Sequence, residues 1–262
     1  MINNLRGQKI LKILARNPEI RVPELSESLG VSEATIRRDL DKLEETGQVE
    51  RVHGVALLIE QGVYEPPVLH RIDELADEKR CIGRASAELI HSGESVFIGS
   101  GTTTLEVANN LKGKNNLTVV TNALTVLNAL AQLDGISVIS TGGLLRASEL
   151  SFIGHISELA LGEVRVDKAI IGIPAIDIEA GLTNDYLPEV MTDRAIINMA
   201  VELIVVADHS KFGKAASAYL APIERIHTLV TDEKTDKVIL EKMQDLGITI
   251  VIAEDMFTLD GV

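Results

Sequence analysis

A short glycine- and threonine-rich loop is the segment of this sequence best suited to binding chemistry. Residues 98–104 read Ile-Gly-Ser-Gly-Thr-Thr-Thr and lie between a strand-like run and a helical run. Glycines let a backbone approach a ligand closely, and the amide groups that open the following helix are free to bind an anion. The loop therefore favours a cradle for a phosphoryl group, with a plain strand–helix turn as the alternative. It is not a Walker A loop, because no Gly-Lys-Ser/Thr sequence follows.

Further polar residues follow other strand-like runs of the sequence. They are Thr121-Asn122, Thr141-Gly142-Gly143, Asp185 and Glu189 in a long loop over 181–189, and Lys211. Ligands of open α/β sheets bind beyond the carboxyl ends of the strands. Because all these residues are expected at that edge, we expect them to converge on one ligand site with the loop. Taken singly, each is equally well explained as a turn or a helix cap.

A second candidate surface lies near the N-terminus. Residues 22–39 predict a helix, a short turn at Gly30 and a second helix capped by Ser32. This is the helix-turn-helix layout, whose second helix enters the major groove of DNA with its first residues at the base edges. The residues that we expect to face DNA are Ser32, Glu33, Ala34, Thr35, Arg37 and Arg38, joined by Arg51 and His53 of a following hairpin.

Arg37 and Arg38 are the side chains with the largest expected contribution to this surface. Arginine pairs bidentately with guanine or binds phosphate. Both residues can face solvent while Ile36 and Leu40 face inward, since neighbouring residues are about 100° apart around a helix. An ordinary pair of exposed helix charges is the alternative, and the helix-turn-helix context disfavours it. For Glu33, reading a cytosine and complementing the helix dipole are both open, and we favour the dipole.

Hydrophobic periodicity predicts the elements that must position this surface. Helices are expected over 5–16, 22–29 and 32–46, because apolar residues recur there at three- and four-residue spacing. Two strand-like runs, 48–52 and 55–59, form a hairpin through His53-Gly54. Three helices and a hairpin within about 60 residues outline a winged helix-turn-helix, which we assign to residues 1–59.

Beyond an expected linker over 60–79, the pattern becomes an alternation of strand-like and helical runs up to residue 253, and 254–262 form a tail. Such alternation implies a mainly parallel sheet covered by helices, so the fold class is α/β. The expected strands are 95–98, 117–121, 136–140, 168–173, 203–207, 228–231 and 248–252, and the expected helices are 77–91, 103–111, 123–133, 190–199 and 235–246.

Charge and composition limit the possible classes of protein. The net charge is −14, but residues 1–56 contain nine Lys/Arg and nine Asp/Glu, so the remaining residues account for all of it. That partition permits DNA binding by the N-terminal domain. The single cysteine, Cys81, indicates a reducing compartment. No signal-peptide pattern opens the chain, and no apolar run approaches the ~18 residues of a membrane span. We therefore expect a cytoplasmic protein without membrane contact.

With these elements in place, the sequence resembles a known family. Residues 32–54 read SEATIRRDLDKLEETGQVERVHG and are similar to the signature of the DeoR-type regulators, bacterial transcription regulators of sugar metabolism. Further on, SGTTT, TVVTNAL, TGG, SFIGHISE, VDKAIIGI, IDIEAGLT and DHSKFG resemble successive blocks of the sensor domains of that family. The resemblance covers about residues 5–253. It implies a winged helix that binds operator DNA, and a sensor domain similar in fold to ribose-phosphate isomerase and glucosamine-phosphate deaminase.

The resemblance also implies an effector, a phosphorylated sugar or related metabolite, and the residues that bind it. By motif match, Ser100, Gly101, Thr102 and Thr103 would hold the phosphate, and the rest of the pocket would be lined by Thr121, Asn122, Gly142, Asp177, Glu189 and Lys211. The sequence departs from the family pattern at Val55, at Gly99, over 172–177 and over 183–189. The departures beyond Val55 fall where sugar hydroxyls would be read.

The function expected from these observations is transcription regulation. We expect a repressor of sugar-metabolism genes that binds paired half-sites of double-stranded operator DNA as a homo-oligomer, a dimer or tetramer, under control of a phosphorylated sugar. The alternative is a sugar-phosphate isomerase or deaminase with an attached DNA-binding domain, and a protein-binding scaffold is a third reading. We expect no catalytic residues, no cofactor and no metal, since the histidines lack metal-ligand spacing.

Overall fold

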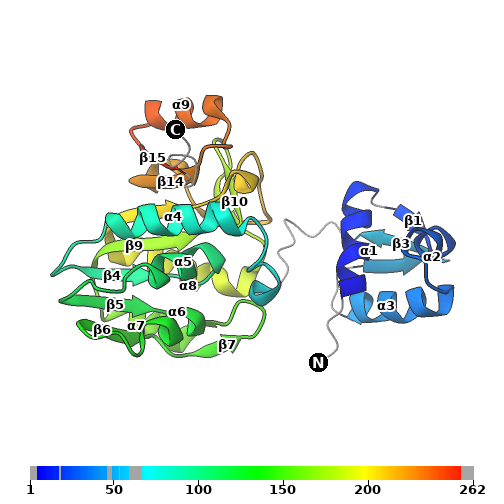
Figure 1. Ribbon diagram of the computed structural model, residues 1–262, viewed down its shortest axis with the longest axis horizontal. Coiled ribbons are helices and arrows are strands. Elements are labelled where there is room, and N and C mark those ends of the chain that lie inside the picture. Colours follow the sequence, from blue (N-terminus) through cyan, green and yellow to red (C-terminus); the bar gives the residue numbers. More distant parts are fainter. Residues whose placement is uncertain (1–4, 18, 46–48, 53, 59–66, 255–262) are drawn as a thin grey trace, which may run out of the picture. The chain divides into compact units, whose positions relative to one another are not determined.

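The computed structural model describes residues 5–17, 19–45, 49–52, 54–58 and 67–254 of the chain. The chain divides into two compact units, Met1–Gln61 and Gly62–Val262, which we call the head and the body (Figure 1). Each unit has its own hydrophobic core, and each is described here by itself.

The head is a three-helix unit with a small sheet. It contains, in chain order, α1 (Leu5–Arg16), β1 (Glu19–Arg21), α2 (Val22–Leu29), α3 (Glu33–Glu45), β2 (Val49–Val52) and β3 (Val55–Leu58). The strands are antiparallel in the order β1-β3-β2. This confirms the expected winged helix-turn-helix. Strand β1 was not expected, because three residues are too few to show an alternating pattern.

The core of the head is built mainly from the apolar residues that recur at three- and four-residue spacing in its helices. Its buried members are Ile10, Leu14, Val22, Leu25, Ile36, Leu40, Leu43, Val49 and Ala56. One polar contact adds to this core: the guanidinium of Arg6 on α1 donates to the buried carboxylate of Asp39 on α3, at 2.5 Å. The contact joins the first helix to the helix that carries the candidate DNA-reading residues.

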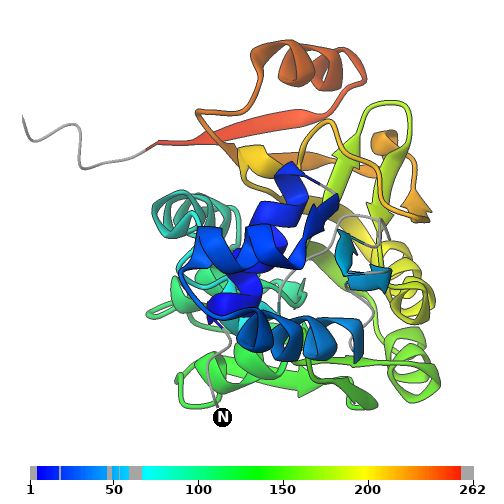
Figure 2. The same cartoon turned by 90° about the vertical axis from the view of Figure 1, so that its right-hand side faces the viewer.

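The centre of the body is a seven-stranded sheet. Its strands are β4 (Ser95–Ile98), β5 (Leu117–Thr121), β6 (Ile136–Ser140), β9 (Val166–Gly172), β12 (Ala200–Val206), β14 (Thr228–Asp232) and β15 (Thr249–Ala253). They lie in the order β15-β14-β12-β9-β4-β5-β6, and every neighbouring pair is parallel. The α/β fold with a mainly parallel sheet is therefore confirmed. Figure 2 shows β15 at the edge of this sheet, in red.

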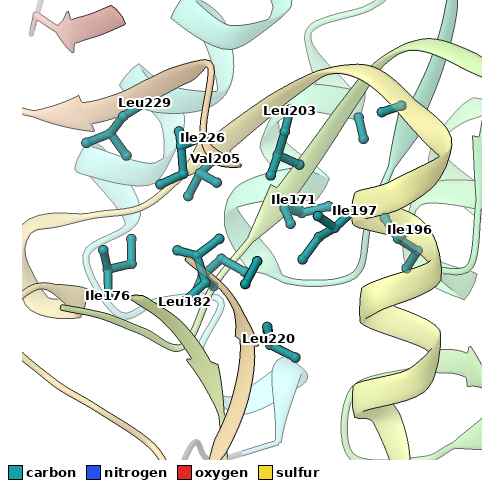
Figure 3. Packing of buried hydrophobic residues seen from close by; sticks show 14 of the residues in the cluster. Ile171, Ile176, Leu182, Ile196, Ile197, Leu203, Val205, Leu220, Ile226 and Leu229 are labelled. Carbon is teal, nitrogen blue, oxygen red and sulfur yellow. The ribbon is translucent and has the colours of Figure 1, made fainter. Parts of the chain in front are cut away.

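Helices cover both faces of the sheet, which explains why the strands read as almost continuous apolar runs. On one face lie α4 (Ala76–Glu88), α5 (Thr102–Asn109) and α6 (Leu124–Leu130), and on the other α7 (His155–Gly162), α8 (Val190–Met199) and α9 (Lys237–Asp245). Successive strand residues enter different cores: Val96 and Ile98 pack under α4 and α5, whereas Phe97 belongs to the cluster of which Figure 3 shows a part.

Several short elements of the body were not expected from the sequence. They are the hairpin β7 (Leu144–Arg146) and β8 (Ser151–Ile153), helix α7, the antiparallel sheet of β10 (Ala175–Asp177), β11 (Gly181–Asn184) and β13 (Ala218–Ala221), and the 3-10 turns η1 (Val68–His70), η2 (Leu187–Glu189), η3 (His209–Lys211) and η4 (Ile223–Arg225). The expected long loop over 181–189 is wrong, since β11 and η2 occupy most of it. Strand β11 pairs with β13, which is far away in sequence and leaves no local signal.

The expected linker over 60–79 is folded where the structure describes it. From Pro67 the chain packs on the body: Val68 is buried, and its N–H donates to the carbonyl of Ser148 at 2.8 Å. Helix α4 already begins at Ala76. Residues 67–79, here called the entry segment, therefore belong to the body. The other part of that linker, 60–66, and the expected tail apart from Glu254 lie outside the described residues.

Helices α4 and α5 approach each other very closely, and Gly83 makes this possible. A Cβ atom built on Gly83 would lie 2.5 Å from Cβ and 2.6 Å from the carbonyl carbon of Glu106 on α5. Only a residue without a side chain fits there. The crossing places the first turn of α4 and the loop that opens α5 around one cavity, described below.

We expect Gly83→Ala to lower the free energy of unfolding of the body by about 1–3 kcal/mol, because the added methyl group meets backbone. The control is Gly162→Ala on α7, where nothing lies within 4 Å of a built Cβ. That change should be neutral or stabilise by up to ~1 kcal/mol, since alanine is the better helix former. Urea denaturation of the two variants checks the pair, and equal stabilities would contradict the tight crossing.

Candidate functional sites

The helix-turn-helix of the head is formed by α2, a turn and α3. Gly30 ends α2 in the left-handed conformation, with φ 64°. The hydroxyl of Ser32 accepts the backbone N–H of Thr35 at 3.3 Å and lies 2.9 Å from the hydroxyl of Thr35. Ser32 is therefore the N-cap of α3, as its position after Gly30 predicts.

The first turns of α3 present their polar side chains to solvent. Ser32, Glu33, Ala34, Arg37 and Arg38 are exposed, Thr35 is half-buried, and Ile36 and Leu40 are buried. Arg37 pairs with Glu33 one turn earlier, with 3.2 Å between Nη2 and Oε2. Within the described part of the chain, Arg38 makes no ion pair or side-chain hydrogen bond, so its guanidinium is available to a ligand. The expected DNA-facing set thus shares one accessible helix surface.

The wing contributes less to this surface than expected. Arg51 on β2 is paired with acidic residues of α3: its Nη2 atom lies 2.8 Å from Asp41 Oδ1 and 3.9 Å from Glu44 Oε2. To reach DNA, Arg51 would have to exchange these partners. His53, the other expected wing contact, lies outside the described residues.

In the body, the glycine–threonine loop connects β4 to α5. Gly101 has φ 125° and precedes the first residue of α5, so the position requires glycine. The Thr104 hydroxyl donates to the Gly101 carbonyl at 3.0 Å and fixes the turn. Thr102 and Thr103 are buried in the first turn of the helix. The amides that open α5 thus face a ligand position with a partial positive charge.

A cavity opens in front of this loop, with about 1100 Å³ of empty space that includes its opening to solvent. Its walls come from the carboxyl ends of four adjacent strands, β12, β9, β4 and β5, which is where ligands of open α/β sheets bind. The residues expected for the effector that line it are Ser100, Gly101, Thr102, Thr103, Asn122, Glu189 and Lys211.

Three expected residues lie outside the cavity lining. The hydroxyl of Thr121 donates to the carbonyl of Ile98 at 2.7 Å and links β5 to β4 within the sheet. Gly142 lies in the turn after β6, beyond the four strands that form the walls. The carboxylate of Asp177 accepts the N–H groups of Glu179 and Ala180, both at 2.9 Å, and so closes the turn between β10 and β11. Thr121 and Asp177 thus have structural roles, and Gly142 lies away from the cavity.

The cavity is also lined by residues that were not expected from the sequence, and most of them lie on elements that were not expected either. Arg71 and Lys79 come from the entry segment, Arg146 from β7, and Asn184 from β11. Arg146 bonds to the carboxylate of Glu189 and stacks on the ring of Tyr186, with 4.1 Å from its guanidinium carbon to the ring centre. The sequence contained one signal for such a residue. Lys79 is a charged residue in the first turn of the helix expected over 77–91.

One wall of the cavity holds two neighbouring carboxyl groups, Glu189 and Asp193. Glu189 is buried and accepts a hydrogen bond from the Ser151 hydroxyl at 3.0 Å, in addition to its bond with Arg146. Desolvation, and then repulsion from Glu189, raises the pKa of Asp193 well above its usual range, although Asn184 donates to its Oδ2 atom at 2.7 Å. This wall offers acceptors and donors suited to hydroxyl groups.

The side of the cavity near the loop is basic. Lys79 and Lys211 both line it, and the buried carboxylate of Asp208 lies near them. Desolvation lowers the pKa of Lys79, and Arg71 and Lys211 lower it further, whereas Asp208 raises it. Asp208 itself accepts the N–H of Ser210 at 3.0 Å. An anion bound here would face two ammonium groups and the amides that open α5.

Asn122 presents an unsatisfied group at the cavity. Its side chain is 2% exposed, and its amide donates to the carbonyl of Phe152 at 3.3 Å. Within the described part of the chain, its Oδ1 atom has no hydrogen-bond partner. A buried acceptor without a donor is costly, so a ligand that donates a hydrogen bond there would gain affinity.

No group of three or more His, Cys, Asp or Glu residues among the described residues has the arrangement of a metal site. Among the described helices, none is long and apolar enough to cross a membrane.

Comparisons with known proteins agree with this division into head and body. Residues 6–62 match the family model of the DeoR-like helix-turn-helix domain, and residues 74–233 match that of the DeoR C terminal sensor domain. Together with the exposed α3 and the separate cavity, these matches define a DNA-binding transcription regulator with a sensor domain. The chain belongs to the DeoR family of transcriptional regulators.

Relatives resemble the chain over nearly its whole length. It is 32% identical to the HTH-type transcriptional regulator GolR of Listeria innocua over 249 residues, which covers 95% of this chain and 98% of that protein. It is 34% identical to the glycerol-3-phosphate regulon repressor of Escherichia coli over 240 residues, covering 92% of this chain and 95% of that protein. The names of these relatives are those of regulators, and the chain is a regulator, not an enzyme.

Among solved structures, two resemble 52% and 62% of the chain. Ribose 5 phosphate isomerase A from Neisseria gonorrhoeae matches with a TM-score of 0.39 and 19% identity, covering 52% of this chain and 53% of the isomerase. The eIF2B beta protein from Chaetomium thermophilum matches with a TM-score of 0.43 and 17% identity, covering 62% of this chain and 52% of that protein.

Proposed function

We propose that this protein represses sugar-metabolism genes by binding operator DNA through α3, and that a phosphorylated sugar or related metabolite bound in the cavity of the body controls the affinity for DNA. The observation that carries the proposal is the composition of the cavity. The amides that open α5 and the ammonium groups of Lys79 and Lys211 suit a phosphoryl group, while Asn122, Asn184 and Glu189 suit hydroxyls.

The names of relatives support a repressor and a phosphorylated effector. One is the glycerol-3-phosphate regulon repressor of Escherichia coli, and another is the transcriptional repressor AccR of Agrobacterium fabrum. We further propose that the protein works in the cytoplasm as a dimer or tetramer. A single helix-turn-helix unit makes few base contacts, so paired heads on two half-sites would supply the affinity that one head lacks.

The experiment that tests the proposal uses the full-length protein. Operator sequences are first selected from a pool of random duplexes, and a panel of sugar phosphates is then screened by thermal shift and by DNA-binding anisotropy. The matched unphosphorylated sugars are the controls. We expect at least one sugar phosphate, and not its parent sugar, to raise the melting temperature and change DNA affinity by roughly 5–150-fold. If no member of the panel changes either quantity, the proposed effector class is wrong.

Asn122→Ala separates recognition of the sugar from recognition of the phosphate. Loss of one buried hydrogen bond costs about 1–3 kcal/mol, so binding of the sugar phosphate found by the screen should weaken roughly 5–150-fold. Binding of inorganic phosphate should change by less than about twofold. Isothermal titration of both ligands measures this.

Thr125→Ala is the matched control for this prediction. The Thr125 hydroxyl is also buried without a hydrogen-bond partner in the described residues, but Thr125 does not line the cavity. An equal loss of sugar-phosphate affinity in both variants would contradict a direct role of Asn122.

A further inference from the structure

The entry segment, residues 67–79, connects the cavity with the chain that leads to the head. Four of its residues line the cavity: Arg71, Glu74, Leu75 and Lys79. The head ends at Gln61, so Pro67 follows it by only six positions along the chain. Because this segment is continuous with the chain that leads to the head, a change in its contacts with the body acts directly on the connection to the DNA-binding unit.

Polar contacts made by cavity-lining side chains anchor the entry segment. The guanidinium of Arg71 pairs with the carboxylate of Glu149 at 2.5 Å, and both side chains are 9% exposed. The ammonium of Lys79 donates to the backbone carbonyl of Arg71 at 2.7 Å. Both cations therefore have partners within the protein, and an anion in the cavity would compete for the same cations.

The backbone is strained on both sides of the contact between Arg71 and Glu149. Leu75, between Arg71 and Lys79, has φ 50°, and Leu150, next to Glu149, has φ 51°. A residue with a side chain is unfavourable in the left-handed region and persists there only when surrounding contacts maintain it. The entry segment and the β7–β8 turn are thus in conformations that would relax if the contact between them weakened.

Burial disfavours the charged form of Lys79 and lowers its pKa. The carboxylates of Asp208 and Glu74 raise this pKa, whereas the neighbouring cations Arg71 and Lys211 lower it. A ligand with negative charge would stabilise the ammonium more than one neutral carbonyl does. A phosphoryl oxygen in place of the Arg71 carbonyl would therefore stabilise the ammonium of Lys79.

We propose that Lys79 and Arg71 bind the phosphoryl group of the effector directly, and that in doing so they exchange their bonds to the Arg71 carbonyl and to Glu149 for bonds to the ligand, which loosens the entry segment. This inference rests on the proposed function of the cavity. It assigns two binding residues beyond the loop at 100–103, and it identifies the entry segment as the part of the body that reports occupancy to the head.

The test follows hydrogen exchange in the full-length protein with inorganic phosphate as the probe. Phosphate should slow exchange in peptides that cover the loop and the start of α5, because the amides there become bonded. In the same sample, peptides within 67–79 should exchange at least about fivefold faster, at the lower end of common allosteric coupling.

Two variants should act in opposite directions. Lys79→Met should weaken phosphate binding at least tenfold and remove the acceleration within 67–79. Glu149→Gln removes the carboxylate that competes for Arg71, so phosphate should bind several-fold tighter, and 67–79 should already exchange fast without it. Because misfolding weakens binding in both cases, it does not produce this pair of results.

Lys168→Met is the matched control. Lys168 is also buried, and its ammonium bonds to Glu94 at 2.6 Å and to the Leu89 carbonyl at 2.7 Å, outside the cavity lining. Phosphate affinity and the exchange response should be unchanged in this variant.

The outcomes separate this inference from the proposed function. If phosphate protects the loop while 67–79 is unaffected, or if Lys79→Met binds phosphate as tightly as the parent, the inference is overturned and the cavity remains an effector site. If neither phosphate nor any sugar phosphate of the panel alters exchange in the loop, the inference and the proposed function fail together.

Discussion

Arg38→Ala is expected to lower the affinity of the full-length protein for its selected operator by roughly 5–150-fold, the equivalent of about 1–3 kcal/mol for one bidentate base contact. Arg38 is exposed on α3, and no ion pair within the described residues competes for it. Arg37→Ala should have a smaller effect, because the pair with Glu33 already occupies part of its hydrogen-bonding capacity. Anisotropy titrations over a range of salt concentrations measure both effects.

Salt dependence distinguishes base contacts from phosphate contacts in these variants. If the lost contact is to a phosphate, the slope of log affinity against log salt should fall by about 1, and unrelated duplexes should lose affinity equally. Arg80→Ala is the control, since Arg80 forms a similar exposed pair with Asp77 at 3.1 Å, but in the body. Unchanged operator binding in both head variants would refute the assignment of α3 as the DNA-reading helix.

Thr102→Glu should weaken sugar-phosphate binding by at least about 100-fold and abolish the effector response, while operator binding stays intact. Thr102 is buried in the first turn of α5, where a carboxylate would face the phosphoryl group. Two like charges about 4 Å apart repel by ~4 kcal/mol at an effective dielectric constant of about 20. Calorimetry with the effector and anisotropy with the operator measure the two properties in one preparation.

Thr102→Ser is the companion variant, since it keeps the hydroxyl and loses only a methyl group. It should retain binding within several-fold and keep the response. If Thr102→Glu still responds to the effector, the phosphoryl group binds elsewhere. Circular dichroism of both variants verifies that the overall fold is retained.

The elements that carry the strongest periodic patterns were predictable from the sequence. Helices α1, α2 and α8 and strands β4, β5 and β6 have the expected bounds, because their apolar spacing is regular over the whole element. Parallel pairing followed from alternation alone. Strands of three or four residues, such as β1, β7 and β11, were not predictable, since their pairing with residues distant in the chain decides whether they form.

In the candidate sites, too, some residues could be predicted from the sequence and others could not. Ser100 to Thr103, Asn122 and Lys211 were placed at the cavity because strand ends of a parallel sheet share one edge. Arg71 and Lys79 were overlooked because their segment has the appearance of a linker and is positioned only by tertiary contacts. Asp177 occupies a turn instead, because its carboxylate caps the backbone of the residues that follow it.

The neutral balance of residues 1–56 and the strong acidity of the rest of the chain have a consequence for binding to any duplex. The body repels any duplex that comes within about a Debye length, ~8 Å at physiological salt, whatever its sequence. This repulsion opposes binding to operator DNA and to unrelated DNA alike, so it lowers both affinities. Discrimination between the two must then come from contacts made by the head.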